Sequence, residues 1–317
     1  MISKNIIKSF MNFFKRGTYR NIYWYIEKLK LLIKHPFSAS KSAKYFINRF
    51  IADQESRFGK YNHKYKIIFL SGMAMSGTTW MKNLLARLPG YYTRGMPMND
   101  EIVYSQGICD SAFSNLPKNG YSLYKTHLNP ETEYLDCIFR NGVKKIIITH
   151  RDLRDIILSR YYRLINYPKP INSFDYIDYR SIGFEKAIDH SIEIVGSDYK
   201  KWILGWLENK EKYPDKILII KFEDMKSDTK KEFTKVLDFY HIKLEDKKIN
   251  QIIEECRGKK TQDIGISRIL PWGLSSNFRS GKIGEWKNQL NPKQIDRCKF
   301  LFGDVLIKTG YEENLDW

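Results

Sequence analysis

KIIFLSGMAMSGTTWMKNLLARL, residues 66–88, joins a strand signal to a helix signal through a glycine-bearing turn. Ile67 to Leu70 form a short apolar run that is typical of a buried strand. Apolar residues then recur at helical spacing, at Met81, Leu84, Leu85 and Leu88. The start of a helix has unpaired backbone N–H groups and the positive end of the helix dipole, so it binds anions. The stretch predicts a phosphate-binding turn, and an ordinary turn with incidental glycines is the alternative.

The turn departs from the nucleoside triphosphatase pattern G-x-x-x-x-G-K-[ST]. Gly72 and Gly77 have the required spacing, but Thr78 stands in the lysine position and Thr79 follows it. That lysine contacts the β- and γ-phosphates in such enzymes. The turn therefore indicates an anion site that is not built for ATP hydrolysis. A P-loop kinase or NTPase remains the second hypothesis, which binding of ATP with Mg²⁺ would support.

Composition limits the class of protein and its partners. The chain has 317 residues, 42% of them hydrophobic, which suffices for one large α/β domain with or without an appendage. Its net charge of +18 implies a nucleic acid, a membrane surface, or an anionic cofactor or substrate. No nucleic-acid-binding module is recognisable, so we expect no nucleic acid partner.

Cysteine usage and hydropathy bear on the compartment. The four cysteines form no C-x-x-C pair, which argues against a zinc site or a disulfide framework and fits a reducing compartment. No apolar run approaches the ~18 residues of a membrane helix, and no signal peptide is evident. We therefore expect a cytoplasmic protein.

Residues 1–65 differ from the rest of the chain in charge. They contain 14 Lys or Arg and three acidic residues, a net charge of +11. Apolar residues fall at helical spacing near the start, at Ile2, Ile6, Phe10 and Phe13. We predict a basic amphipathic helical extension that packs on the domain, with peripheral contact to an anionic membrane as the alternative. The predicted catalytic domain is then residues 66–317.

Further strand signals alternate with helical periodicity along the domain. Strands are predicted at 121–127, 143–149 and 217–222, and a loop at the turn-rich residues 89–100. Helices are predicted at about 131–141, 153–165, 181–195, 198–211, 229–240, 246–256 and 292–308. This alternation predicts an α/β fold with a parallel sheet flanked by helices, in which ligands bind beyond the carboxyl ends of the strands.

Candidate chemical groups follow two of these strands. Arg151 comes directly after a strand, with Ser159 eight residues later, and the pair suggests a second anion site; a surface arginine is the alternative. Lys125 and His127 lie on the same face of an extended strand. The lysine disfavours the imidazolium, so His127 is a candidate general base, and a hydrogen-bonded core histidine is the alternative.

Five stretches in a fixed order carry a resemblance to a known family. They are AMSGTTW at 74–80, KTHL at 125–128, R-x-x-x-D-x-x-x-S at 151–159, FEDM at 222–225 and RSGKIGEWKN at 279–288. With these, the sequence resembles the sulfotransferases that use 3′-phosphoadenosine 5′-phosphosulfate (PAPS), namely the cytosolic type and its bacterial relatives. The resemblance implies a P-loop-like domain that transfers SO₃ in line to an acceptor hydroxyl and leaves adenosine 3′,5′-bisphosphate (PAP), without a metal.

The resemblance also implies residue roles. Lys125 would neutralise charge on the sulfuryl group, and His127 would take the proton of the acceptor hydroxyl. The 5′-phosphosulfate would be held by Ser76, Gly77, Thr78 and Thr79. The adenine would be bordered by Trp80 and Phe222. The 3′-phosphate side of the cofactor site would comprise Arg151, Ser159, Arg279, Ser280 and Gly281.

Two departures from the family pattern affect the expected activity. Met75 stands where the family has a lysine or arginine beside the leaving phosphate. Ser280 replaces a lysine in the stretch 279–288, which we call the late loop. A catalytically impaired relative that binds PAPS is therefore the third hypothesis, and Lys82, Lys125 and Lys282 are the candidate substitutes for the lost cation. The predicted acceptor loops lie within 89–120, 166–182 and 257–278, and the tyrosines of the first two suit sugar rings or an aromatic ring, with plain packing as the alternative. Together with the basic N-terminus they lead us to expect a carbohydrate or glycolipid hydroxyl as the acceptor.

Overall fold

The computed structural model describes residues 58–93, 106–114, 116, 120–166, 177–256 and 281–317. The predicted N-terminal extension lies outside the described residues up to residue 57. Arg279, Ser280 and large parts of the predicted acceptor loops lie outside them as well.

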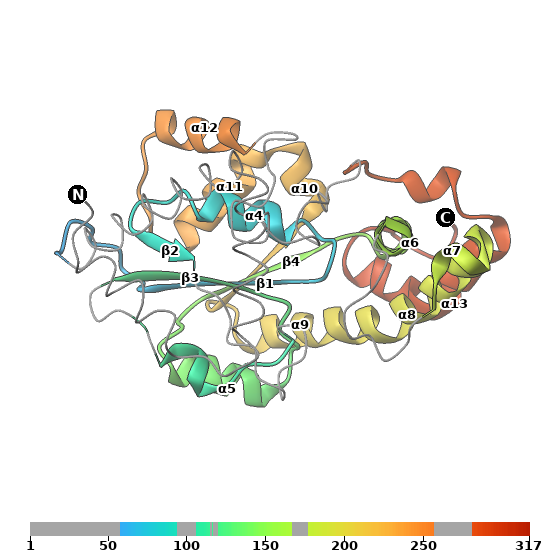
Figure 1. Ribbon diagram of the computed structural model, residues 1–317, viewed down its shortest axis with the longest axis horizontal. Helices are drawn as coiled ribbons and strands as arrows, with labels where there is room; N and C mark the ends of the chain where they lie inside the picture. The colour runs from blue at the N-terminus through green and yellow to red at the C-terminus, as the bar shows by residue number, and fades with distance from the viewer. Residues whose placement is uncertain (1–57, 94–105, 115, 117–119, 167–176, 257–280) are drawn as a thin grey trace, which may run out of the picture. The chain divides into compact units, whose positions relative to one another are not determined.

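Five parallel strands form one sheet in the order β2-β3-β1-β4-β5 (Figure 1). Their bounds are Ile67–Gly72 for β1, Tyr91–Thr93 for β2, Tyr121–Thr126 for β3, Ile146–His150 for β4 and Ile217–Lys221 for β5. In the register, Leu70 lies opposite Lys125 and Gly72 lies opposite Thr149. The turn after β1 is therefore placed between the ends of β3 and β4, where a parallel sheet binds its ligands.

Helices cover both faces of this sheet (Figure 1). One face carries α4 (Thr78–Leu85), α10 (Phe222–Ser227), α11 (Thr229–Phe239) and α12 (Asp246–Glu255), and the other carries α5 (Thr132–Arg140) and α9 (Lys200–Lys212). Beyond the carboxyl ends of the strands lie α6 (Leu153–Asn166), α7 (Tyr179–Ile182), α8 (Phe184–Ile194) and α13 (Pro292–Lys308). Shorter elements are η1 (Asp110–Phe113), the π-helical η2 (Val195–Tyr199) and η5 (Glu285–Asn288).

Alternate residues of β1 contribute to two separate hydrophobic cores. Ile67 and Phe69 belong to the core that includes α5, α6, α9 and α13, whereas Ile68 and Leu70 belong to the core that includes α4, α11 and α12. Successive side chains of a strand point to opposite faces, so a strand covered on both faces reads as a continuous apolar run. This explains why the strand signal at residues 67–70 has no polar alternation.

The predicted α/β fold with a parallel sheet is confirmed, and three local predictions need correction. The loop predicted at 89–100 contains the short edge strand β2. The strand predicted from Val143 begins at Ile146, because Val143 N closes a turn by donating to Ile138 O at 3.0 Å. Phe222, predicted to end a strand, begins α10. The first is a missed edge strand and the other two lie at element boundaries, where pairing between distant segments outweighs local sequence preference.

The described residues contain neither a candidate membrane span nor a candidate metal cluster. No described helix combines the length and hydrophobicity needed to cross a bilayer. The same part of the chain contains no group of three or more His, Cys, Asp and Glu side chains arranged to hold a metal ion.

Candidate active site

Three hydroxyl groups fasten the turn after β1 to the end of β4. Ser76 Oγ lies 2.7 Å from the carbonyl oxygen of Met73 and 3.0 Å from Thr149 Oγ1. Thr78 Oγ1 lies 2.9 Å from Thr149 Oγ1, and Met73 N donates to Thr149 O at 3.0 Å. Ser76, Thr78 and Thr149 are all buried. The predicted phosphosulfate residues Ser76 and Thr78 therefore use their hydroxyls to shape the loop, which leaves backbone groups as its anion donors.

The loop has little room for additional atoms. A Cβ on Gly72 would lie 2.0 Å from Thr149 Oγ1, so only glycine allows the hydroxyl cluster to form there. Gly77 has a φ of 79° and a Cβ on it would lie 2.7 Å from the Phe222 ring. Met75 has a φ of 68°, a left-handed conformation that is uncommon outside glycine. The strained backbone is held by contacts on both sides and marks the loop as a candidate functional segment.

The N-terminus of α4 has no side-chain cap. Its N-cap is Gly77, which has no side chain to accept a hydrogen bond, and its first turn contains no acidic residue. The first N–H groups of a helix, here those of Thr78, Thr79 and Trp80, have no acceptor within the helix. These donors and the positive end of the helix dipole suit this position for an anion.

His127 and Lys125 meet at the carboxyl ends of β1 and β3. His127 Nδ1 lies 2.5 Å from the carbonyl oxygen of Gly72, and its Nε2 lies 2.8 Å from Lys125 Nζ. A carbonyl only accepts, so Nδ1 carries the proton and Nε2 keeps a lone pair. Burial, followed by the positive charge of Lys125, lowers the pKa of His127 to about 3. The imidazole is therefore neutral, with its basic nitrogen facing the lysine.

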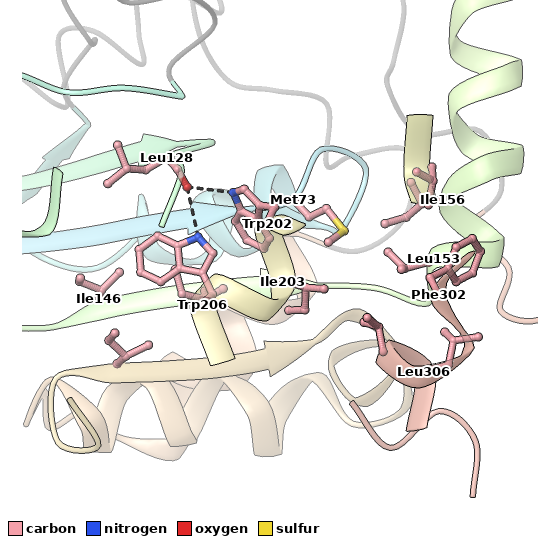
Figure 2. Close-up of a cluster of buried hydrophobic side chains, with 14 of the residues drawn as sticks. Met73, Leu128, Ile146, Leu153, Ile156, Trp202, Ile203, Trp206, Phe302 and Leu306 are labelled. Carbon is pink, nitrogen blue, oxygen red and sulfur yellow. Dashed lines mark hydrogen bonds between the residues drawn. The ribbon is translucent and has the colours of Figure 1, made fainter. Parts of the chain in front are cut away.

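Helix α9 holds the backbone that directly follows His127. The indole nitrogens of Trp202 and Trp206 both donate to the carbonyl oxygen of Leu128, at 2.9 and 3.2 Å (Figure 2). Asn209 Nδ2 donates to Pro130 O at 2.8 Å, one turn further along α9. Because both lone pairs of one buried carbonyl are used, the chain after His127 is fixed in one position.

Arg151 and Ser159 come together as predicted, next to the late loop. Arg151 Nη1 donates to Ser159 Oγ at 3.0 Å, and Nη2 donates to the carbonyl oxygen of Lys282 at 2.7 Å. Glu223 Oε1 lies 4.0 Å from Arg151 Nε, an atom that is buried and has no hydrogen-bond partner among the described residues. Gly281, with a φ of 58°, directly precedes Lys282. The structure thus brings Arg151, Ser159 and Gly281 to one place.

Asp155 fixes the late loop onto α6. Its carboxylate accepts from Gly284 N at 2.8 Å and from Trp286 N at 3.3 Å, and it lies 3.5 Å from Arg151 Nη2. Burial raises the pKa of Asp155, although Arg151 and the two N–H donors oppose this shift. Asp155 therefore links the first turn of α6 to residues 282–286.

The aromatic residues predicted to border an adenine also lie together. The rings of Trp80 and Phe222 are 6.3 Å apart in an edge-to-face arrangement. Arg151 Cζ lies 4.5 Å from the centre of the Phe222 ring, so these side chains connect the α4 N-terminus to the Arg151 cluster. Two anion-binding groups joined by aromatic side chains match the shape of a nucleotide with phosphates at both ends.

Three residues that contribute to this arrangement were absent from the predicted site. Thr149, the penultimate residue of the apolar strand β4, supplies the third hydroxyl, and Glu223 approaches Arg151. Asp155 was visible in the R-x-x-x-D-x-x-x-S spacing but had received no role. A polar residue at the end of an apolar strand was the available signal for Thr149.

Comparison with known proteins then gives the family. A sulfotransferase domain model matches residues 66–310, which is most of the chain. The chain belongs to the PAPS-dependent sulfotransferase family. Flavonol 3-sulfotransferase of Flaveria bidentis is 26% identical over 267 residues, which are 77% of this chain and 82% of that protein. Human sulfotransferase 1C2 is 28% identical over 190 residues, which are 57% of this chain and 60% of that protein.

Solved structures agree with this fold. Mouse sulfotransferase SULT7A1 complexed with PAP superposes with a TM-score of 0.59 at 20% identity, covering 82% of this sulfotransferase and 90% of that chain. Retinol dehydratase with androsterone and PAP gives a TM-score of 0.53 at 16% identity, covering 76% and 80%. The predicted family, fold class and enzyme class are confirmed, which decides against the kinase or NTPase hypothesis.

Proposed function

We propose that this sulfotransferase transfers SO₃ from PAPS to an acceptor hydroxyl with His127 as the general base. The observation that carries the proposal is the orientation of the imidazole: Nδ1 is bound to Gly72 O and Nε2 lies beside Lys125 Nζ. The base therefore stands next to the turn after β1 and next to a cation. Both the family and the PAP complexes of the structural neighbours support this cofactor.

The residues present fit a nucleotide with phosphates at both ends. The uncapped start of α4 offers N–H donors to one phosphate, and Arg151 has a buried Nε without a hydrogen-bond partner among the described residues. Ser76, Gly77, Thr78 and Thr79 would form the first site through their backbone, and Arg151, Ser159 and Gly281 the second. Arg279 and Ser280 stay predictions, because they lie outside the described residues. PAPS supplies the activated sulfuryl group when it is bound.

The charge around His127 explains how a residue of such low basicity acts as a base. In the free protein the pKa of His127 is lowered to about 3 by burial and by Lys125. A general base works best when its pKa lies near the operating pH. An anion bound at α4 would offset the part of the lowering that Lys125 causes, whereas the larger part, which burial causes, would remain. The bound cofactor thus brings the pKa of the base closer to the operating pH.

The nature of the acceptor remains a prediction. Three of the relatives are named for flavonols, and one structural neighbour was solved with androsterone. Our expectation of a carbohydrate or glycolipid hydroxyl gains no support from these proteins. Cytoplasmic location and peripheral membrane contact through residues 1–65 likewise stay predictions.

Thermal unfolding with PAP, and separately with ATP and Mg²⁺, tests the cofactor. A ligand at about 100 times its dissociation constant stabilises the folded state by roughly 2.7 kcal/mol. We expect a rise in Tm with PAP alone. A rise with ATP and Mg²⁺ alone, or with neither ligand, would contradict the proposed cofactor.

Replacement of His127 tests the base. His127→Ala should abolish PAP formation from PAPS with whichever acceptor the wild type uses among a flavonol, androsterone and a hexose, while PAP still binds. His63→Ala is the matched control. His63 lies in the segment before β1, and its Nε2 also contacts a backbone carbonyl, that of Pro89, at 2.9 Å. Retained turnover in His127→Ala would remove His127 from the mechanism. If the wild type binds PAP without turning over PAPS, Met75 has produced an impaired relative instead.

A further inference from the structure

The guanidinium of Arg154 lies against two indole rings that also contact each other. Its Cζ is 3.9 Å from the ring centre of Trp286 and 4.3 Å from that of Trp317. The two indoles themselves meet edge to face with their centres 5.5 Å apart. Arg154 is 2% exposed, and cation–π contacts are strongest when the cation is desolvated. We call these three residues the Trp–Arg–Trp stack.

Two carboxylates hold the stack from opposite directions. Asp152, directly before α6, accepts from Arg154 Nε at 3.0 Å and from Nη2 at 2.7 Å. Glu312, in the segment after α13, forms an ion pair with Arg154 Nη1. A buried guanidinium needs such partners, since an unpaired charge is costly to bury. Arg154 thereby ties residues 311–317 to the start of α6.

Residues 311–317 have two more anchors in the same region. Tyr311 Oη donates to Glu223 Oε2 at 2.7 Å, and Glu223 Oε1 accepts from Asp152 N at 3.2 Å. Leu315 contacts α13 so closely that a Cβ on Gly303 would lie 2.5 Å from Leu315 Cδ2. The segment is therefore held at several points and can act as a support for what packs on it.

The late loop is what packs on it. Trp286 belongs to the stack through its ring, while its N–H and that of Gly284 donate to Asp155. Four residues before Trp286, the carbonyl of Lys282 accepts from Arg151. The ring of Trp286 also meets that of Trp317 edge to face. The loop that begins at Gly281 is thus held both by α6 and by Trp317.

We infer that the Trp–Arg–Trp stack is a positioning device for the 3′-phosphate side of the cofactor site. Through Trp286 it fixes the loop that follows Gly281 in the arrangement that presents that loop to Arg151. Trp317 and Arg154 are positioning residues in this inference, not residues that touch the cofactor. The inference rests on the proposed function for the identity of the ligand, but the effect of the Trp–Arg–Trp stack on the loop does not depend on any ligand.

The experiment compares Trp317→Ala and Trp317→Phe with the wild type in the full chain. In ligand-free protein, hydrogen exchange of the Gly284 and Trp286 amides should be about tenfold faster in Trp317→Ala and close to wild type in Trp317→Phe, which keeps an aromatic ring. Affinity for PAP should fall about tenfold in Trp317→Ala, whereas affinity for AMP, which lacks the 3′-phosphate, should not change. A merely structural role would weaken both nucleotides alike.

Phe300→Ala is the control for loss of an exposed Arg–aromatic contact elsewhere on the C-terminal part of the chain. Phe300 is 78% exposed on α13, with Arg297 Cζ 5.4 Å from its ring centre. Phe300→Ala should leave the hydrogen exchange of the Gly284 and Trp286 amides unchanged, and the affinities for PAP and AMP as well. Unchanged exchange at Gly284 and Trp286 in Trp317→Ala, or equal loss of PAP and AMP binding, would overturn the inference. A wild type that does not bind PAP would instead overturn the proposed function, and the exchange result would still decide about the stack.

Discussion

Removing the two indole N–H groups that bind Leu128 O should give a strongly non-additive loss. Trp202→Phe and Trp206→Phe each delete one hydrogen bond, of 2.9 and 3.2 Å, and keep an aromatic ring in place. Each single change leaves the carbonyl with one donor, so each should cost about 0.5–1.5 kcal/mol in free energy of unfolding from the bond itself. The double variant leaves a buried carbonyl without a donor, which adds about 1–3 kcal/mol. The double loss should therefore exceed the sum of the single losses by at least ~1 kcal/mol.

The same variants should report on His127, because Leu128 is the next residue. We expect kcat to fall about tenfold in the double variant, since misplacement of a catalytic group is costly, and PAP affinity to stay unchanged. Urea unfolding gives the stability terms, and PAP formation gives kcat. A control cycle that combines Trp206→Phe with Ile252→Val, a change in the separate core on the other face of the sheet, should be additive. Additive losses in the Trp202–Trp206 cycle, with kcat no lower than in the single variants, would refute the reasoning.

Three further changes test the loop and the buried histidines. Met75→Lys should raise kcat/KM for PAPS by about tenfold, because it restores a cation at the leaving phosphate. The left-handed φ of 68° at this position is equally strained for both side chains, so the backbone should not change. An unchanged kcat/KM would mean that another cation already acts there. Gly72→Ala should lower stability by about 1–3 kcal/mol or more in urea, since its Cβ would lie 2.0 Å from Thr149 Oγ1, and wild-type stability would contradict this packing. Burial lowers the pKa of His150 to about 3, so as pH falls from about 6.5 toward 3 the unfolded chain binds a proton before the folded chain does. The free energy of unfolding should therefore fall by up to about 4 kcal/mol over this pH range. His150→Asn should flatten this loss, and an unchanged slope would exclude His150 as its source.

The sequence was sufficient for elements that depend on near neighbours. Apolar runs and helical spacing located four of the five strands and the long helices, because periodicity reports which face of an element is buried. Strand β2 was missed because three residues at the edge of a sheet show no period. Phe222 was placed at a strand end, yet it starts α10 and its ring covers Gly77, a contact across 145 positions that no local pattern contains.

The candidate site was predictable as a set of residues but not as a set of contacts. Ser76 and Thr78 were predicted to hold the 5′-phosphosulfate, and the structure adds that their hydroxyls contact Thr149. That contact exists because β4 pairs with β1, and strand order is not written in the pattern of either strand. Lys282 was considered for its charge, and the structure adds a contact of its backbone carbonyl with Arg151 that the sequence did not indicate.

The chain carries a net charge of +18, but the buried arginines near the site are balanced by acidic side chains. Arg151 has Asp155 at 3.5 Å and Glu223 at 4.0 Å, and Arg154 has Asp152 and Glu312, so both buried arginines are already paired with acids. These ion pairs fix the geometry of the arginines and cancel much of their long-range field. In addition to Lys125 beside His127, the backbone N–H groups and the helix dipole at the start of α4 contribute positive potential over one turn. The hydroxyl cluster fixes the loop that carries these N–H groups, whereas Asp155 and the Trp–Arg–Trp stack fix the loop beside Arg151.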